Sequence, residues 1–478
     1  MKIQHFMALV VLSLGFKART LVPGLLTLTC LLVAAPATAQ VNYAVSGSTA
    51  YVASSPNASG DVVIASTFNG YPVTHIDQYA FNNCTNLTSV TIPNSVWAIG
   101  SYAFSGCTSL TNVTIPNSVV YLGQFAFLGC TSLTSVTIPD GLDRIELRAF
   151  YGCTSLTSVT IGNGVTLIID DAFENCTSLT NVTIPNSVTY IGGAAFGGCT
   201  SLTSVTIGNG VTKIWGDAFS GCTSLTNFSV AATNPAYSSL DGVLFNKAQT
   251  GIFIFPLGRA GSYVIPDSVT SIGGNAFNAC TSLTSVTIPN SVTSIGVSAF
   301  ASCTSLTNVT IPNNVTGIGN GAFSGCTSLT SVTIPNSVTR IGYEAFMSCT
   351  NLTNFTFLGN APVLIPYSTN SFGRWFANVG AGAKAYYYCG TTGWGATYCG
   401  LPTVMLFAPR IAPGSAGVKP GGFGFTLTCL TNQTVVEASA NLVNWQPIWT
   451  NALPGASAEF VDPEWLQHSN HFYRARSD

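Results

Sequence analysis

The chain repeats one pattern of apolar and polar positions every 23 residues. A representative copy, residues 326–348, has the sequence CTSLTSVTIPNSVTRIGYEAFMS. Its Leu, Val and Ile are spaced so that a short strand directs them inward between polar neighbours. The following Pro-Asn favours a turn, and Val-Thr-Arg-Ile-Gly predicts a second short extended segment. Each copy therefore predicts two short strands joined by turns.

Cysteine marks the start of each copy. The spacing of 23 residues holds in two runs, which are separated by a 58-residue interval equal to one period plus 35 inserted residues. The eleven cysteines are Cys84, Cys107, Cys130, Cys153, Cys176, Cys199, Cys222, Cys280, Cys303, Cys326 and Cys349. An Ala-Phe pair ends three residues before each of them. Such an array predicts a β-rich solenoid of eleven coils, with the phenylalanines stacked in one buried column.

At these repeat positions the chain resembles the BspA-like leucine-rich repeats, which are known mainly from bacterial surface and secreted proteins. The resemblance covers residues 76–357, where we place a solenoid of leucine-rich-repeat type. It implies adhesion or protein binding. Residues 40–75 resemble the family's N-terminal cap strands. The insertion, at about 231–265, resembles an insert of these solenoids and is expected to be a β-hairpin.

Three segments follow the repeats. The repeat pattern decays over residues 358–407, which we expect to form a C-terminal cap over the apolar edge of the last coil. Residues 408–422 are rich in Pro and Gly and predict a linker. Alternating apolar residues in 423–478 predict a small all-β tail module.

The N-terminus has the features of an export signal. An apolar stretch from Leu21 to Ala35 follows basic residues and precedes the small-residue site Ala37-Thr38-Ala39. We interpret residues 1–39 as a signal peptide and expect a secreted or surface-associated protein. A membrane anchor is the alternative, but the apolar stretch is short, and no later segment is expected to span a membrane.

Charge and cysteine spacing exclude several functions. Only 7% of residues are charged and the net charge is −2, so nucleic acid is not an expected partner.

The repeat cysteines are expected to form a ladder of buried free thiols, because stacked strands hold their side chains parallel. Cys389 and Cys399 flank a Gly-rich turn and form a candidate disulfide, although two free thiols fit the sequence equally well. Cys429 is expected to be free. No Cys-x-x-Cys pair occurs, so neither a metal nor another cofactor is expected.

Few residues could support catalysis. Beyond the signal, the only histidines are His75, His468 and His471. The acidic residues of two adjacent coils are Asp140, Asp143, Glu146, Asp170, Asp171 and Glu174. Arg148 precedes Asp171 by 23 residues, which predicts an ion pair between coils rather than an active site. We therefore expect no enzyme, and a catalytic site in the tail module is the least supported alternative.

Threonine forms a regular outward array. It stands seven residues after nearly every repeat cysteine, with Ser or Asn two residues earlier. This array is a candidate surface for glycans or ice. Because threonine also favours strands and forms cross-strand ladders, the array has a purely structural explanation as well.

One position of the second strand varies instead. In successive coils it holds Ala98, Tyr121, Arg144, Leu167, Tyr190, Lys213, Ser271 and Ser294. Tyr, Trp and Arg dominate the energetics of protein interfaces. The candidate binding surface therefore comprises Trp97, Tyr121, Arg144, Tyr190, Lys213 and Trp215. We expect it to bind an extracellular protein or matrix ligand, with glycan or ice binding by the threonine array as the alternative.

Overall fold

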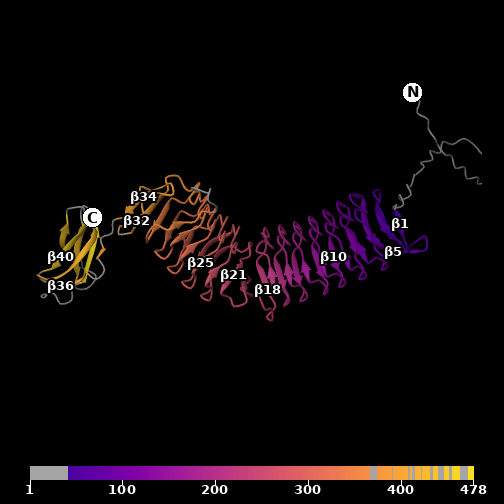
Figure 1. The fold of residues 1–478 in the computed structure, drawn as a ribbon, viewed down its shortest axis with the longest axis horizontal. Coiled ribbons are helices and arrows are strands. Elements are labelled where there is room, and N and C mark those ends of the chain that lie inside the picture. The colour runs from indigo at the N-terminus through magenta and orange to yellow at the C-terminus, as the bar shows by residue number, and fades with distance from the viewer. Residues whose placement is uncertain are drawn as a thin grey trace, which may run out of the picture. The chain divides into compact units, whose positions relative to one another are not determined.

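The computed structural model describes residues 41–366, 374–389, 391–406, 410–411, 415–420, 422–430, 434–439, 446–451, 455–462 and 472–477 (Figure 1). The expected signal peptide, residues 1–39, lies outside these ranges, as do His468 and His471. Within them every regular element is a β-strand, and no helix is a candidate for crossing a membrane.

Two ladders of mainly parallel strands run along the solenoid, with one rung of each in every coil. The first ladder contains β3 (Gly60–Val63), β6 (Leu87–Thr91), β8 (Asn112–Thr114), β10 (Ser135–Ile138), β12 (Ser158–Ile161), β14 (Asn181–Ile184), β16 (Ser204–Ile207), β18 (Asn227–Val230), β22 (Gly261–Val264), β24 (Leu283–Thr287), β26 (Asn308–Thr310), β28 (Ser331–Ile334), β30 (Asn354–Phe357), β32 (Lys384–Tyr388) and β34 (Leu401–Leu406).

The second ladder consists mostly of two-residue strands. It contains β2 (Thr49–Val52), β5 (Tyr71–Ile76), β7 (Ala98–Ile99), β9 (Tyr121–Leu122), β11 (Arg144–Ile145), β13 (Leu167–Ile168), β15 (Tyr190–Ile191), β17 (Lys213–Ile214), β21 (Gly251–Ile254), β23 (Ser271–Ile272), β25 (Ser294–Ile295), β27 (Gly317–Ile318), β29 (Arg340–Ile341) and β31 (Val363–Leu364).

The register of the ladders equals the sequence period. Val136 pairs with Val159 and Thr137 with Thr160, each 23 residues further along the chain. Each residue type therefore stacks on its own kind. A slip of one residue would turn the buried Val and Ile outward, so burial itself specifies the register.

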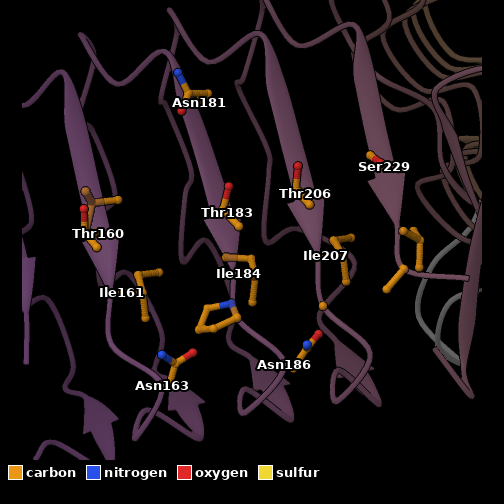
Figure 2. A pocket seen from close by; sticks show the side chains of 15 residues that line it. Thr160, Ile161, Asn163, Asn181, Thr183, Ile184, Asn186, Thr206, Ile207 and Ser229 are labelled. Carbon is orange, nitrogen blue, oxygen red and sulfur yellow. The ribbon is translucent and has the colours of Figure 1, made fainter. Parts of the chain in front are cut away.

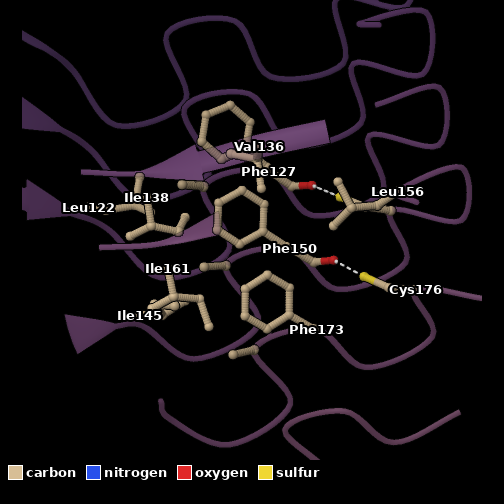
Figure 3. Close-up of a cluster of buried hydrophobic side chains, with 14 of the residues drawn as sticks. Leu122, Phe127, Val136, Ile138, Ile145, Phe150, Leu156, Ile161, Phe173 and Cys176 are labelled. Carbon is tan, nitrogen blue, oxygen red and sulfur yellow. Dashed lines mark hydrogen bonds between the residues drawn. The ribbon is translucent and has the colours of Figure 1, made fainter. Parts of the chain in front are cut away.

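The predicted phenylalanine column is present. From Phe81 to Phe219, successive rings stack with centroids 5.1–5.5 Å apart, and a second run extends from Phe277 to Phe346. Figure 3 shows Phe127, Phe150 and Phe173 lying one above another in the core. All rings of the column are at most 1% exposed. Each ring therefore contacts two coils besides its own.

The repeat cysteines form the expected ladder of buried free thiols. The Sγ of Cys107 donates to the backbone carbonyl of Phe81 at 3.0 Å, and the Sγ of Cys176 to that of Phe150 at 3.3 Å (Figure 3). Removal from water disfavours the thiolate and raises the pKa of Cys107 and Cys222 to about 12. These cysteines therefore link coils as thiols.

The insertion contains the expected hairpin and also continues the solenoid. Strands β19 (Tyr237–Leu240) and β20 (Val243–Asn246) pair antiparallel, and β20 pairs antiparallel with β21. Strands β21 and β22 then pair in parallel with β23 and β24. The insertion thus adds a rung to both ladders. The hydrophobic core of the solenoid is divided into two clusters at strand β20, where Leu244 belongs to the first cluster and Phe245 to the second.

The two ends of the repeat region add further rungs. At the N-terminal end, β1 (Tyr43–Ser46) and β4 (Thr67–Phe68) pair antiparallel with ladder strands. Strand β3 precedes the first cysteine coil, whereas β32 and β34 follow the last, and β33 (Thr397–Tyr398) pairs with β34. The solenoid accordingly has about 14 turns. The prediction of eleven is low because the end segments and part of the insertion follow the coil path without the cysteine that marks a copy.

The tail is an all-β module, as expected. Its strands are β35 (Arg410–Ile411), β36 (Gly417–Lys419), β37 (Gly422–Leu430), β38 (Thr434–Ser439), β39 (Gln446–Asn451), β40 (Gly455–Asp462) and β41 (Phe472–Ser477). Phe425, Leu427, Val436 and Phe460 form its core. The predicted linker, 408–422, is wrong because β35 and β36 lie within it and pair antiparallel with β37. The Pro and Gly residues that suggested a linker are also compatible with short strands at the edge of a sheet.

The phenylalanine column should dominate the stability of the solenoid. We expect Phe196→Ala to lower the free energy of unfolding by about 3–5 kcal/mol, because stacked neighbours on both sides keep the cavity from collapsing. Urea-induced unfolding followed by circular dichroism measures the loss. Tyr121→Ala, which truncates an exposed ring, is the matched control. A loss below about 1 kcal/mol at Phe196 would contradict burial of its ring.

Thiol labelling should separate burial from oxidation. In denaturant without reductant, the eleven repeat cysteines should all react with a thiol reagent, because all are free. In the native protein the same cysteines should react slowly, since burial suppresses the thiolate. Mass spectrometry of a non-reduced digest is the independent check. Disulfides among these residues would refute the thiol ladder.

The same thiols predict a loss of stability at alkaline pH. Cys107 and Cys222 have pKa values raised from 9.0 to about 12 by desolvation, so their stabilising effect is complete below about pH 9 and is lost as the pH rises towards 12. The Tm should therefore fall as the pH rises from about 9 to about 11 at constant ionic strength. Cys153→Ala should reduce this pH dependence. A Tm that stays level over this range would contradict the raised pKa values.

Candidate functional site

The second ladder places the variable residues in one outward column. Its register aligns His75, Ala98 and Tyr121 in one sheet, and Arg144, Leu167, Tyr190 and Lys213 in the next. The exposed fractions are 51% for Trp97, 47% for Tyr121 and 49% for Trp215. All six residues predicted from the sequence thus lie on or beside this column. Five of them form two groups, and the sixth, Arg144, lines a separate hollow.

The first group surrounds a hollow of about 490 Å³. His75, Trp97 and Tyr121 are its aromatic lining, and Asp77, Gln78 and Ser101 are polar lining residues. Tyr51 stacks on His75 with ring centroids 4.8 Å apart and an interplanar angle of 11°. We call Tyr51, His75, Trp97 and Tyr121 the N-terminal aromatic surface.

Sequence reasoning did not include Tyr51 and His75 in the candidate surface. Both precede the first repeat cysteine, so no marker assigned them to a coil. A signal was nevertheless present, because His75 stands 23 residues before Ala98 and therefore belongs to the same column.

A second hollow, of about 340 Å³, lies between Tyr121 and Arg144. Arg144 donates to Asp143 at 3.1 Å, and its Nε lies 4.0 Å from a carboxylate oxygen of Glu146. The hydrogen bond and charge of Asp143 raise the pKa of Arg144. The two carboxylates largely neutralise this guanidinium, and exposed pairs of this kind contribute little to stability.

The second group consists of Tyr190, Lys213 and Trp215, which we call the Lys213 cluster. The Lys213 Nζ lies 5.5 Å from the ring centroid of Tyr190 and 5.2 Å from that of Trp215. The indole N–H of Trp215 donates to the Tyr190 hydroxyl at 2.7 Å. Each of the two aromatic rings therefore makes a cation–π contact with the same ammonium group.

Aromatic residues also occupy the turn that follows the column in the first coils. Tyr79, Tyr102 and Phe125 stack in series with centroids 5.0 and 4.6 Å apart. All three have a left-handed backbone, with φ of 60°, 57° and 60°. The same left-handed backbone recurs at this turn position in other coils, for example at Arg148 and Asp171, so it belongs to the geometry of the repeat rather than to a local site. In the later coils the same turn position holds Asn275, Ser298 and Gly321.

The threonine array is outward-facing, as predicted, and also has a hollow. Figure 2 shows a row of Thr160, Thr183 and Thr206 beside a row of Ile161, Ile184 and Ile207. The hollow has a volume of about 540 Å³, and Asn163 and Asn186 lie at its turn. A different set of threonines, four residues after each cysteine, has a structural role: Thr111 Oγ1 donates to the Thr88 carbonyl at 3.1 Å, one coil earlier.

The acidic residues form structural contacts. Arg148 pairs with Asp171 at 2.9 Å, as predicted, and Asp170 and Asp140 accept backbone N–H groups of the next coil. Desolvation raises the pKa of Glu174, and the charge of Asp171 adds to the effect. In the described ranges, no group of His, Cys, Asp or Glu is arranged to hold a metal ion.

The candidate disulfide between Cys389 and Cys399 is wrong. Cys389 is disulfide-bonded, whereas Cys399 is a free, half-buried thiol, so the two are not joined. Cys399 itself has a left-handed backbone (φ 49°) at the turn that connects β33 to β34. The antiparallel pairing of β33 with β34, and not a disulfide to Cys389, therefore fixes the position of Cys399. The side chain of Cys429 lies outside the described residues.

Comparison with known proteins agrees with this architecture. A family model described as the BspA type leucine rich repeat region (6 copies) matches residues 74–189, 166–249 and 253–370. A leucine-rich cell surface protein from Faecalibacterium prausnitzii is 34% identical, with a TM-score of 0.59, over 73% of this chain and 93% of its own. The pneumococcal vaccine antigen PcpA shares the fold at 21% identity and a TM-score of 0.52, over 73% of this chain and 92% of its own. Among curated proteins, none matches the sequence. The matched repeats extend through both cores of the solenoid, and the chain belongs to the BspA-type leucine-rich-repeat family.

Proposed function

We propose that this protein is an extracellular, non-catalytic binding protein that docks a protein partner on the variable column of its N-terminal coils. The observation that carries the proposal is the uneven distribution of exposed aromatic residues. Tyr121 on this column and Trp97 and Trp215 beside it are each about half exposed. Further along the chain, Ser271, Ser294 and Gly317 occupy the column.

The chemistry of the column suits an interface. Trp and Tyr offer a large contact area and a polar group while losing little conformational entropy. Short strands, whose inward neighbours Ile99, Leu122 and Ile145 are fully or almost fully buried, hold these side chains. Binding therefore requires little ordering of the surface, which lowers the entropic cost of association.

Glycan binding on the threonine array is the second candidate. The hollow over β12, β14, β16 and β18 favours it, because it combines hydroxyl and amide groups with an apolar floor. Its side chains are small, however, and it has no aromatic lining. A uniform array also offers little basis for selecting one ligand over another.

Two double variants should discriminate between the surfaces. Tyr121→Ala with Tyr190→Ala should weaken binding to a protein partner at least tenfold, since removal of an interface hot spot costs about 2 kcal/mol or more. Thr137→Ala with Thr183→Ala should leave that binding unchanged. The measurement is surface plasmon resonance against a panel of matrix proteins and polysaccharides, after circular dichroism has established that both variants fold.

The opposite pattern would transfer the function to the threonine array. If the tyrosine variant binds normally and the threonine variant fails, recognition depends on hydroxyl groups. Retention by immobilised polysaccharides or adsorption to ice would then identify the ligand class.

A further inference from the structure

We propose that the hollow at Ala98 is a receptor slot for the cationic side chain, Lys or Arg, of the protein partner. This inference rests on the proposed protein-binding function and specifies the chemistry that the partner must present. The slot arises because small Ala98 occupies the rung between His75 and Tyr121. We call this hollow the Ala98 slot.

The aromatic walls of the Ala98 slot are held in place. Tyr51 stacks against one face of the His75 ring, which directs the other face towards the next rung. Because that rung holds Ala98, which is 7% exposed, no side chain of the column covers this face. Tyr121 lies one rung further, and Trp97 tilts towards His75 with ring centroids 6.5 Å apart. Three aromatic side chains therefore line one opening.

The width of the slot suits a cation. Rings on adjacent rungs, Tyr51 and His75, have centroids 4.8 Å apart. Two rungs therefore separate His75 from Tyr121 by about 9.6 Å. A cation midway between them would lie about 4.8 Å from each ring, within the limit of about 6 Å for a cation–π interaction.

The charge of this part of the chain favours the same occupant. Residues 41–143 contain four acidic residues, Asp61, Asp77, Asp140 and Asp143, and no Lys or Arg. Asp77 lines the slot. The next cation along the column, Arg144, already pairs with Asp143 and approaches Glu146. Asp77 is exposed and its Oδ1 accepts the backbone N–H of Gln78 at 2.8 Å, and a cationic occupant would add an attraction to this carboxylate that a neutral aromatic side chain could not make.

The Lys213 cluster is a precedent within the same molecule. On the same column, Tyr190 and Trp215 both contact the ammonium group of Lys213. The aromatic residues around Ala98 have no such cation of their own within the described residues. The partner would supply this cation.

Two peptides test the identity of the occupant. The probes are the peptide (Gly-Ser-Lys)₄ and the same peptide with every lysine acetylated, titrated against the purified protein at 150 mM NaCl by isothermal calorimetry or fluorescence anisotropy. We expect the lysine peptide to bind at least about fivefold more tightly than the acetylated peptide. The corresponding arginine peptide should behave like the lysine peptide. Equal binding of lysine and acetyl-lysine peptides would overturn the proposal.

Substitutions then test the location. Ala98→Leu fills the slot without removing a wall, and Asp77→Asn removes its carboxylate. Each should weaken binding of the lysine peptide at least about fivefold. The matched controls are Ser294→Leu, at the same ladder position in the second half, and Asp267→Asn, an exposed carboxylate elsewhere. Both should bind like the wild type. An effect of the controls equal to that of the slot variants would show nonspecific attraction and would refute the slot.

The outcomes separate this inference from the proposed function. If a matrix protein binds, loses affinity with Tyr121→Ala and Tyr190→Ala, but tolerates both Ala98→Leu and acetylation of its own lysines, the surface functions as proposed and the slot inference is wrong. If no protein of the panel binds while the lysine peptides behave as expected, the slot stands and the proposed function fails for that panel.

Discussion

In-register stacking of one coil on the next is the constraint on which the structure depends. It aligns backbone groups for hydrogen bonding between coils and brings each phenylalanine within 5.1–5.5 Å of its counterparts in the N-terminal run. It also seats each thiol against a carbonyl of the preceding coils, as with Cys107 and Phe81. An inward side chain must therefore pack within its own coil and against the coils on both sides. This requirement accounts for the near identity of the inward positions from coil to coil. Outward positions have no such restriction.

On this regular scaffold, surface features arise from changes at single outward positions. A change at one outward position creates a local feature without disturbing the core, because the strands beneath keep their register. At Ala98 a small side chain between two rings produces a hollow, and at Lys213 a long side chain contacts the rings of Tyr190 and Trp215. Recognition on such a scaffold is thus built by choosing side-chain size along one column, and it requires no loop or moving element.

The insertion shows how the solenoid tolerates an interruption. Strands β21 and β22 pair forward with β23 and β24 in the manner in which β2 and β3 pair with β5 and β6 at the N-terminal end. Both β3 and β22 begin at a glycine with positive φ and contain a register shift after it. The two segments share one requirement: each has an irregular start but must pair with a following strand that has the standard repeat geometry. Two core clusters meet there because the phenylalanine column restarts.

The sequence alone determined the solenoid, the phenylalanine column, the free thiols and the Arg148–Asp171 pair, because a strict period converts sequence distance into spatial distance. It also selected Trp97, Tyr121 and Tyr190 as outward residues. The tertiary structure alone revealed that Tyr51 stacks on His75 at the start of the column, that β35 and β36 belong to the tail module, and that Cys389 does not pair with Cys399. These features lie where the period ends. Without a repeat to relate positions, only the folded chain decides which side chains meet.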